Sequence, residues 1–103
     1  MNKYTELSDF EINEKVAENL KLNTIAYERT EIVLFDDMDA TPFNPCNNPA
    51  DTMPIIIENK IAMNPKDDIW RCGLGWNVAE NKNPLRACME AFLMKKDAEN
   101  EKV

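Results

Sequence analysis

The apolar residues of this chain never run longer than four in a row, as in Ile32-Val33-Leu34-Phe35. A helix needs roughly 20 consecutive apolar residues to cross a bilayer, so no segment is predicted to span a membrane. The 103 residues also have room for only one hydrophobic core. We therefore expect a single small domain, whose elements must be found in short periodic patterns.

The clearest pattern is a helix start near the N-terminus. Ser8 and Glu11 have the spacing of a capping box, in which each side chain binds the backbone N–H of the other residue. Apolar residues then recur at every fourth position. They are Ile12, Val16 and Leu20. This pattern predicts a helix over residues 9–21.

Two further helices are predicted to begin at Asn-Pro steps, because Asn caps a helix and Pro fits the first helical position. The first step is Asn48-Pro49, and Pro54 lies further along the same helix. The helix therefore either starts properly at Thr52 or bends at the proline. Its predicted apolar stripe consists of Met53, Ile56 and Ile57. The second step is Asn83-Pro84, and that helix is expected to end near Lys95-Lys96.

Short strands are favoured between the helices. Residues 24–27 and 31–35 predict a hairpin or two successive strands, and residues 60–63 and 69–76 predict two more strands. Residues 77–82 are polar and are expected to form a loop.

These elements predict an α+β fold in the order α-β-β-α-β-β-α, with three helices packed with one small antiparallel sheet. The domain is expected to span residues 1–96, followed by a polar tail over residues 97–103.

Residues 69–76 alternate between two kinds of face. One face is large and apolar, with Trp70, Cys72, Leu74 and Trp76. The other carries Ile69, Arg71, Gly73 and Gly75, and it is bare enough for another backbone or a ligand to approach closely. Both tryptophans are expected to anchor the core. The alternative for Trp76, which adjoins the polar loop, is an exposed position where it anchors a partner.

The absence of histidine excludes several chemistries. Ser-His-Asp and Cys-His catalysis, and most catalytic zinc sites, need that side chain. The acidic run Asp36-Asp37-x-Asp39 fails as an EF-hand, because Pro42 and Asn48 stand where the motif needs Gly and Glu. We therefore expect no catalytic set, no metal and no cofactor. An enzyme with carboxylate chemistry remains as a minor alternative.

The net charge of −7 is distributed unevenly, with −6 of it in residues 1–40. Such a chain lacks the cationic footprint of a duplex-binding protein, so direct nucleic-acid binding is not expected. Glu11, Glu14 and Glu18 line one side of the first predicted helix. The simplest interpretation is a solvated face, and the alternatives are a surface that attracts a basic partner or a mimic of DNA.

The three cysteines are odd in number and widely spaced, and no secretory signal precedes them. We expect free, reduced thiols in a cytoplasmic protein. Asn47, Asn48 and Asp51 next to Cys46 form the densest group of hydrogen-bonding side chains. They are expected to cap the helix, although a ligand or partner site at this helix start is the alternative. Cys46 has no histidine to activate it as a nucleophile.

Four segments of the chain form a recognisable set. They are Tyr4-x-Glu6-Leu7-Ser8-Asp9-Phe10-Glu11-Ile12-Asn13, Cys46-Asn47-Asn48-Pro49-Ala50-Asp51, Pro54-Ile55-Ile56 with Glu58-Asn59, and Asn83-Pro84-Leu85-Arg86-Ala87-Cys88. Together they resemble the NinX-like family of small lambdoid phage and prophage proteins. The resemblance spans nearly the whole chain, and it extends to the wider group of phage α-β-α sandwich domains. It implies expression in the cytoplasm of an infected bacterium and brings no activity with it. Met53 stands where other members often carry Trp, so an aromatic is not required there.

The function predicted from these features is that of a small acidic interaction protein, not an enzyme, which binds and modulates a host or phage protein. The partner has a basic surface in the alternative where the acidic N-terminal region makes the contact. The alternatives are a small-ligand binder at the helix start of residues 47–51, a DNA mimic, and a carboxylate-based enzyme. The protein is expected to be a monomer or a homodimer. The candidate binding residues are Cys46, Asn47, Asn48, Asp51, Arg71, Trp76, Glu11, Glu14 and Glu18.

Overall fold

The computed structural model describes residues 2–100. Within this range the chain forms three helices and five strands, and all strand pairs are antiparallel. In chain order they are α1 (Asp9–Asn19), β1 (Thr24–Tyr27), β2 (Ile32–Phe35), α2 (Pro49–Asn59), β3 (Ala62–Lys66), β4 (Ile69–Leu74), β5 (Asn77–Asn81) and α3 (Pro84–Asn100). The predicted α+β class with three helices is confirmed.

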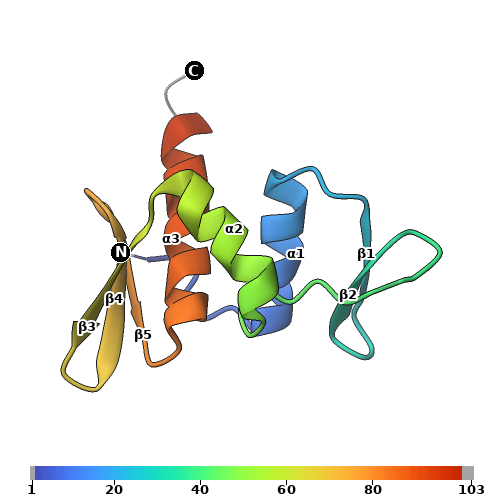
Figure 1. The fold of residues 1–103 in the computed structure, drawn as a ribbon, viewed down its shortest axis with the longest axis horizontal. Helices are drawn as coiled ribbons and strands as arrows, with labels where there is room; N and C mark the ends of the chain where they lie inside the picture. Colours follow the sequence, from blue (N-terminus) through green and yellow to red (C-terminus); the bar gives the residue numbers. More distant parts are fainter. Residues whose placement is uncertain (1, 101–103) are drawn as a thin grey trace.

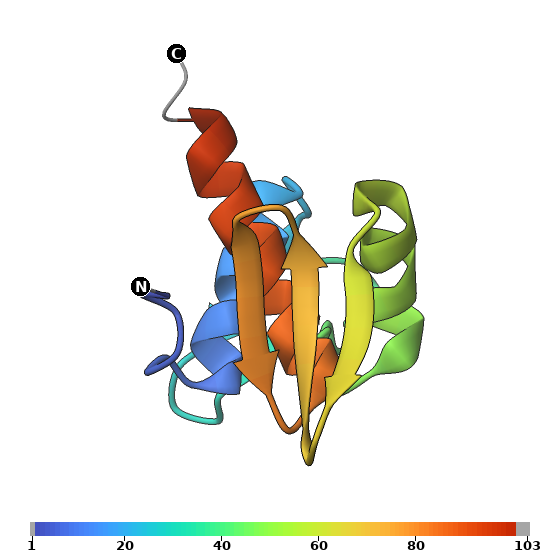
Figure 2. The same cartoon turned by 90° about the vertical axis from the view of Figure 1, so that its left-hand side faces the viewer.

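The strands form two sheets where one was expected. β1 and β2 make a hairpin, and β3, β4 and β5 make a three-stranded sheet in that order. The helices lie between the two sheets, with α3 against β4 and β5 and α1 against β2 (Figure 1). Figure 2 shows the three-stranded sheet face-on, with its outer face open. The layer order is therefore sheet, helices, sheet, which differs from that of an α-β-α sandwich.

The loop predicted over residues 77–82 was wrong, because Asn77–Asn81 form strand β5. Its residues pair with β4, with Ala79 opposite Cys72 and Asn77 opposite Leu74. β4 ends at Leu74, and Gly75 takes a φ of 64° that turns the chain back on itself. Few side chains in β5 favour a strand, so its extended form depends on the backbone bonds to β4 and on the burial of Ala79.

Gly73 shows why one face of β4 carries so little side chain. Its φ is 142°, and a Cβ at this position would lie 2.1 Å from the carbonyl oxygen of Asn77. The close approach predicted at this bare face is therefore made by the backbone of a neighbouring strand. β3 also lies further along the chain than residues 60–63, and it includes Pro65. An edge strand tolerates proline because the missing N–H can point away from the ladder.

The predicted start of α1 is confirmed. The backbone N–H of Glu11 donates to the Ser8 hydroxyl at 3.1 Å, and the backbone N–H of Ser8 donates to Glu11 Oε1 at 3.0 Å. The helix ends at Asn19, slightly before the predicted end at Lys21. The buried stripe includes Ile12 and Val16, as predicted, so α1 is amphipathic in the expected sense.

Helix α2 starts at Pro49 with Asn48 as its cap, and it continues through Pro54. The predicted apolar stripe was partly wrong, because Met53 is 38% and Ile57 69% exposed. The residues that α2 buries lie on a different face, and they recur at the three- and four-residue spacing of a helix. The members of this face are Thr52, Ile55, Ile56 and Asn59.

Helix α3 is the centre of the molecule. Residues 86–93 are all buried, because the sheet covers one side of the helix and α1 and α2 cover others. The helix runs to Asn100, a turn beyond the predicted end at Lys95-Lys96. Within that extra turn, Asp97 accepts a hydrogen bond from the Tyr4 hydroxyl and forms an ion pair with Lys3, with 3.2 Å between Asp97 Oδ2 and Lys3 Nζ. The rest of the predicted tail, residues 101–103, lies outside the described residues.

Candidate functional site

The predicted cluster at the start of α2 is found at a junction of the fold. Asn48 Oδ1 accepts from the backbone N–H of Ala50 at 3.1 Å, which is a helix cap. Asp51 Oδ2 accepts from the backbone N–H of Asn44 at 2.9 Å and from the Asn48 side chain at 3.3 Å. Both side chains therefore shape the turn before the helix, as their cap role predicted.

Asn47 connects the starts of all three helices. Its Nδ2 donates to Asp9 Oδ2 at 3.2 Å, at the first residue of α1. Its Oδ1 accepts from Asn83 Nδ2 at 3.4 Å, just before α3, and that amide also donates to the Cys46 carbonyl at 2.6 Å. The N-terminal ends of α1, α2 and α3 therefore meet on one side of the molecule (Figure 1).

Cys46 lies fully buried below this junction. Its backbone N–H donates to Asn13 Oδ1 at 3.1 Å, and its thiol faces the Asp9 carbonyl at 3.8 Å. Burial, assisted by the charge of Asp9, raises the pKa of the Cys46 thiol to about 12. A thiol with so high a pKa holds little thiolate at neutral pH, which is the opposite of what a nucleophile needs.

Arg86 is a central residue of this junction that was not among the predicted binding residues. Its guanidinium binds Glu90 Oε2 at 2.6 Å and Asp9 Oδ1 at 2.7 Å. It also donates to the carbonyls of Tyr4, at 2.9 Å, and Leu7, at 2.7 Å. Burial alone would lower the pKa of Arg86, but the hydrogen bonds to Asp9 and Glu90 outweigh it and the pKa is raised. The available signal was the four-residue spacing of Arg86 and Glu90 within an apolar helix.

A pocket of about 390 Å³ lies beside the junction, between the start of α1 and the β1–β2 hairpin. Asn13, Asn44 and Asn47 contribute to its wall. Their amides bind one another, with Asn13 Nδ2 donating to Asn44 Oδ1 at 2.8 Å and Asn47 Nδ2 to the same oxygen at 3.1 Å. A ligand here would have to compete with these bonds.

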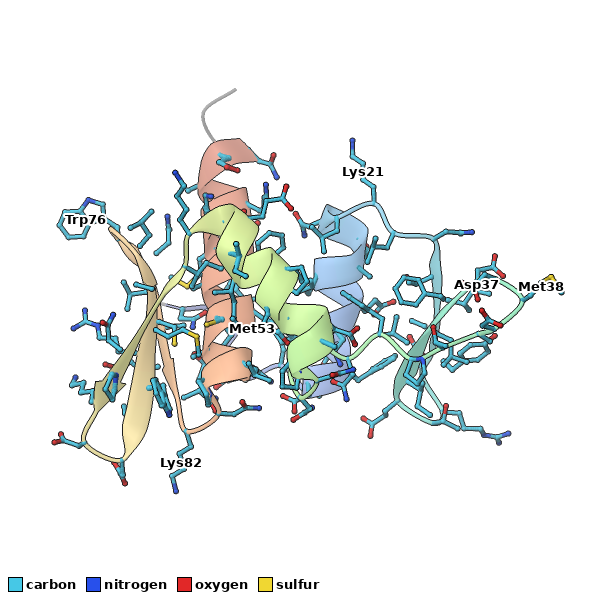
Figure 3. All side chains as sticks on the ribbon, in the orientation of Figure 1. Lys21, Asp37, Met38, Met53, Trp76 and Lys82 are labelled. Atoms are coloured by element: carbon cyan, nitrogen blue, oxygen red, sulfur yellow. The ribbon has the colours of Figure 1, made fainter. Side chains whose placement is uncertain are left out.

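Trp76 lies at the surface, so its predicted place in the core was wrong. The side chain is 98% exposed at the tip of the β4–β5 hairpin, and Figure 3 shows it pointing away from the body. The reason is that the strand ends at Leu74, so the strand alternation does not reach Trp76. Leu74 is itself 57% exposed, while Trp70 is half-buried against the core.

Arg71 lies on the outer face of the three-stranded sheet, opposite Asn64 of β3 and Glu80 of β5. Its Nε is 4.0 Å from Glu80 Oε2, which also pairs with Lys66 Nζ at 3.0 Å. Arg71 and Trp76 both line a shallow depression of about 590 Å³ on this side of the molecule. The structure therefore brings together two of the predicted binding residues, well away from the junction at Asn47.

The acidic residues of α1 have unequal environments. The bonds from Ser8 in the capping box lower the pKa of Glu11, so this carboxylate serves the helix start. Glu18 is exposed and Glu14 half-buried. Glu18 is therefore the best placed of the three to meet a partner.

The comparison with known families decides the identity of the chain. The sequence model of a phage family, described as "Bacteriophage P22, NinX", matches residues 3–96. This chain belongs to the NinX family. The resemblance predicted from four sequence segments is confirmed, and the match covers the helix junction and the Trp76 hairpin alike. No curated protein and no solved structure matches this chain significantly.

Two properties of this NinX-family protein concern the described residues as a whole. In residues 2–100, no three Cys, Asp or Glu side chains are grouped so that they could hold a metal ion. Asp37, in the acidic loop after β2, instead accepts from the backbone N–H groups of Asp39, at 3.0 Å, and Ala40, at 2.8 Å. None of the described helices is long and apolar enough to cross a membrane.

Proposed function

We propose that this NinX-family phage protein acts by binding another protein of the host or the phage, in the cytoplasm of the infected or lysogenic bacterium, and that it catalyses no reaction. The observation that carries the proposal is the exposure of Trp76. A tryptophan that is 98% exposed leaves its whole indole in water, and this is unfavourable unless a partner covers it.

The position of Trp76 suits a binding anchor. The tight turn at Gly75 and the register of β4 with β5 hold the hairpin in one shape, so little conformational entropy is lost when its tip is bound. Leu74 adds apolar surface beside the indole. Trp is enriched among the few interface residues that carry most of a binding energy, and so is Arg, which Arg71 supplies nearby.

The test is a comparison of three forms of the tagged protein expressed in infected cells. We expect the natural protein and Met53→Ala to retain one partner at near-stoichiometric yield, and Trp76→Ala to lose it. Met53 is the matched control, since it is exposed on α2, away from the hairpin tip (Figure 3). Equal thermal stability of the three forms shows that folding is intact. Retention of the same partner by Trp76→Ala would refute the anchor role.

The exposed carboxylate of Glu18 on α1 supports a partner with a basic surface. Reversal of charge at Glu18 should slow association and flatten its dependence on salt, because charges at the rim of an interface act mainly on the association rate. Glu11→Lys is not a fair test, since it also breaks the capping box. A DNA mimic would differ in requiring these carboxylates for affinity as well as for rate.

Small-ligand binding is the second candidate, favoured by the pocket of about 390 Å³ beside Asn47. Its volume lies in the range of small-molecule sites, roughly 300–1,000 Å³. A thermal-shift panel of nucleotides and metal ions tests it. A saturable rise in melting temperature that is lost in Asn44→Ala would support this candidate over protein binding.

A further inference from the structure

The outer face of the β1–β2 hairpin is apolar and largely exposed, and Ile32 at one end of it also lines the pocket beside the start of α1. Ile25 pairs with Leu34 and Tyr27 with Ile32, so these four side chains project from the same side of the hairpin. Ile25, Tyr27 and Ile32 are 41%, 45% and 42% exposed. We call these four residues the hairpin face. Exposed apolar residues are common singly, but three exposed neighbours around the half-buried Leu34 form a patch of the kind that marks an interaction site.

The hairpin face is held in shape by the rest of the protein. On the inner side, Val33 is buried, and the Phe35 ring meets the Phe43 ring edge-on at 5.6 Å. The chain after the acidic loop also bonds to the free edge of β2. The Phe35 N–H donates to the Thr41 carbonyl, and the Phe43 N–H to the Val33 carbonyl, each at 2.9 Å. The face is therefore preformed, and a partner need not order it.

Carboxylates border the hairpin face at both ends. The turn of residues 28–31 carries two acids and one base, and the loop of residues 36–40 carries three acids. These acids are Glu28, Glu31, Asp36, Asp37 and Asp39, and the base is Arg29. All of them are exposed, and none forms an ion pair within residues 2–100. The face thus has an apolar centre and a rim of net charge −4, from five acids and one base.

We propose that the hairpin face is a second docking surface, for a protein whose own surface has an apolar centre bordered by Lys and Arg side chains. Charge complementarity selects this occupant. A second copy of the chain is disfavoured, because it would bring two rims of net −4 against each other.

This surface is independent of the Trp76 anchor. Figure 3 shows Trp76 and Met38, which lies in the loop next to the hairpin face, at opposite ends of the molecule. The three helices lie between them (Figure 1). One molecule has room to engage two partners at once and to hold them on either side. The inference goes beyond the proposed function and does not depend on it.

The experiment uses a synthetic peptide of alternating leucine and lysine as the probe, with a leucine/glutamate peptide as the charge control. Titration of the ¹⁵N-labelled full chain should shift amide signals of residues 24–35 saturably with the lysine peptide. The glutamate peptide should leave them in place. Added salt should weaken the binding, because the rim charges are exposed.

Variants separate the hairpin face from other acidic surfaces. Tyr27→Thr combined with Ile32→Thr removes apolar surface but keeps side chains that suit a strand, and it should weaken binding roughly tenfold. Glu28→Lys combined with Asp36→Lys should flatten the salt dependence. Trp76→Ala should bind the peptide with unchanged affinity, whatever its effect on the other partner. Thermal melts establish that each variant is folded.

Three outcomes would overturn the inference. One is unchanged affinity in the Tyr27/Ile32 variant, and another is signal shifts centred on α1. The third is a dimer of the free protein, seen by sedimentation, that the Tyr27/Ile32 variant converts to a monomer. That result would make a second copy the occupant of the hairpin face.

Discussion

Arg86 and Glu90 form an ion pair inside the protein, one helical turn apart on α3, with 2.6 Å between Nε and Oε2. The two side chains are only 7% and 1% exposed. Glu90 also accepts a hydrogen bond from Asn2, and Arg86 reaches Asp9 at the start of α1. The pair thereby fastens the N-terminal segment and α1 to the central helix.

We expect Arg86→Met to lower the free energy of unfolding by about 3–5 kcal/mol, because it leaves the Glu90 carboxylate buried without a cation. The matched control is Lys66→Met, which breaks the exposed pair with Glu80. That change should cost no more than about 1 kcal/mol. Urea denaturation measures both. If the two variants lost equal free energy of unfolding, the buried pair would contribute no more to stability than the exposed pair.

The two glycines of the β4–β5 hairpin should respond differently to alanine. At Gly75 nothing lies within 4 Å of an added Cβ, so Gly75→Ala meets only the strain of a positive φ, about 1–2 kcal/mol. At Gly73 the Cβ would lie 2.1 Å from the Asn77 carbonyl oxygen, and the strands must move apart. Gly73→Ala should therefore be the more destabilising change in thermal melts. The opposite order would contradict the close approach of β5.

Tyr4 gives the stability a dependence on alkaline pH. Burial, followed by the hydrogen bond and the charge of Asp97, raises the pKa of Tyr4 above its usual value of 10.0. The folded state thus holds the phenolic proton more tightly than the unfolded state does. The resulting stabilisation is complete below about pH 10 and is lost as the pH rises above it.

Replacement of Tyr4 by Phe should abolish this slope and cost about 1 kcal/mol at neutral pH, through loss of the bond to Asp97. Tyr27→Phe is the control, since Tyr27 is 45% exposed. Denaturation between pH 7 and 11 compares the three proteins. If Tyr4→Phe and the natural protein lost stability in parallel above pH 10, the assignment to Tyr4 would be wrong.

The three cysteines should behave as buried free thiols. The hydrogen bond with Cys72, together with burial, raises the pKa of Cys88. We expect three alkylations of the unfolded, non-reduced protein by mass spectrometry, and much slower reaction of the native protein at pH 8. Met38→Cys supplies an accessible thiol as a positive control, because Met38 is fully exposed. Fewer than three alkylations after unfolding would reveal a disulfide.

Local chemistry predicted the helix starts well. Ser8, Asn48 and Pro49 act within one turn of their own backbone, so their effect does not depend on the rest of the fold. The turn-shaping role of Asn48 and Asp51 was predicted correctly for the same reason, because their bonds lie within a few residues of each other. The strand at residues 77–81 was not predicted, because its extended form depends on the backbone pairing with β4 and not on its own side chains.

The candidate site residues show the same contrast between local motifs, which the sequence reveals, and tertiary contacts, which it does not. Glu11 was found as part of a local motif, whereas the role of Arg86 required knowing that residues 4–9 pass beside α3. Trp76 was placed in the core by strand alternation, and the turn at Gly75 removed it from the strand. Ile57 and Met53 looked like core residues and are exposed, because α2 turns another face to α3.

The sequence by itself determined the α+β class, the three helix starts, the acidic N-terminal region and the family, since these depend on residue identity and short-range spacing. Only the tertiary structure decided that there are two sheets, that three helix starts meet at Asn47, and that Trp76 and the hairpin face are exposed at opposite ends. The physical reason is that an apolar side chain favours burial wherever neighbours can cover it. Which neighbours do so is fixed by contacts between residues far apart in the chain.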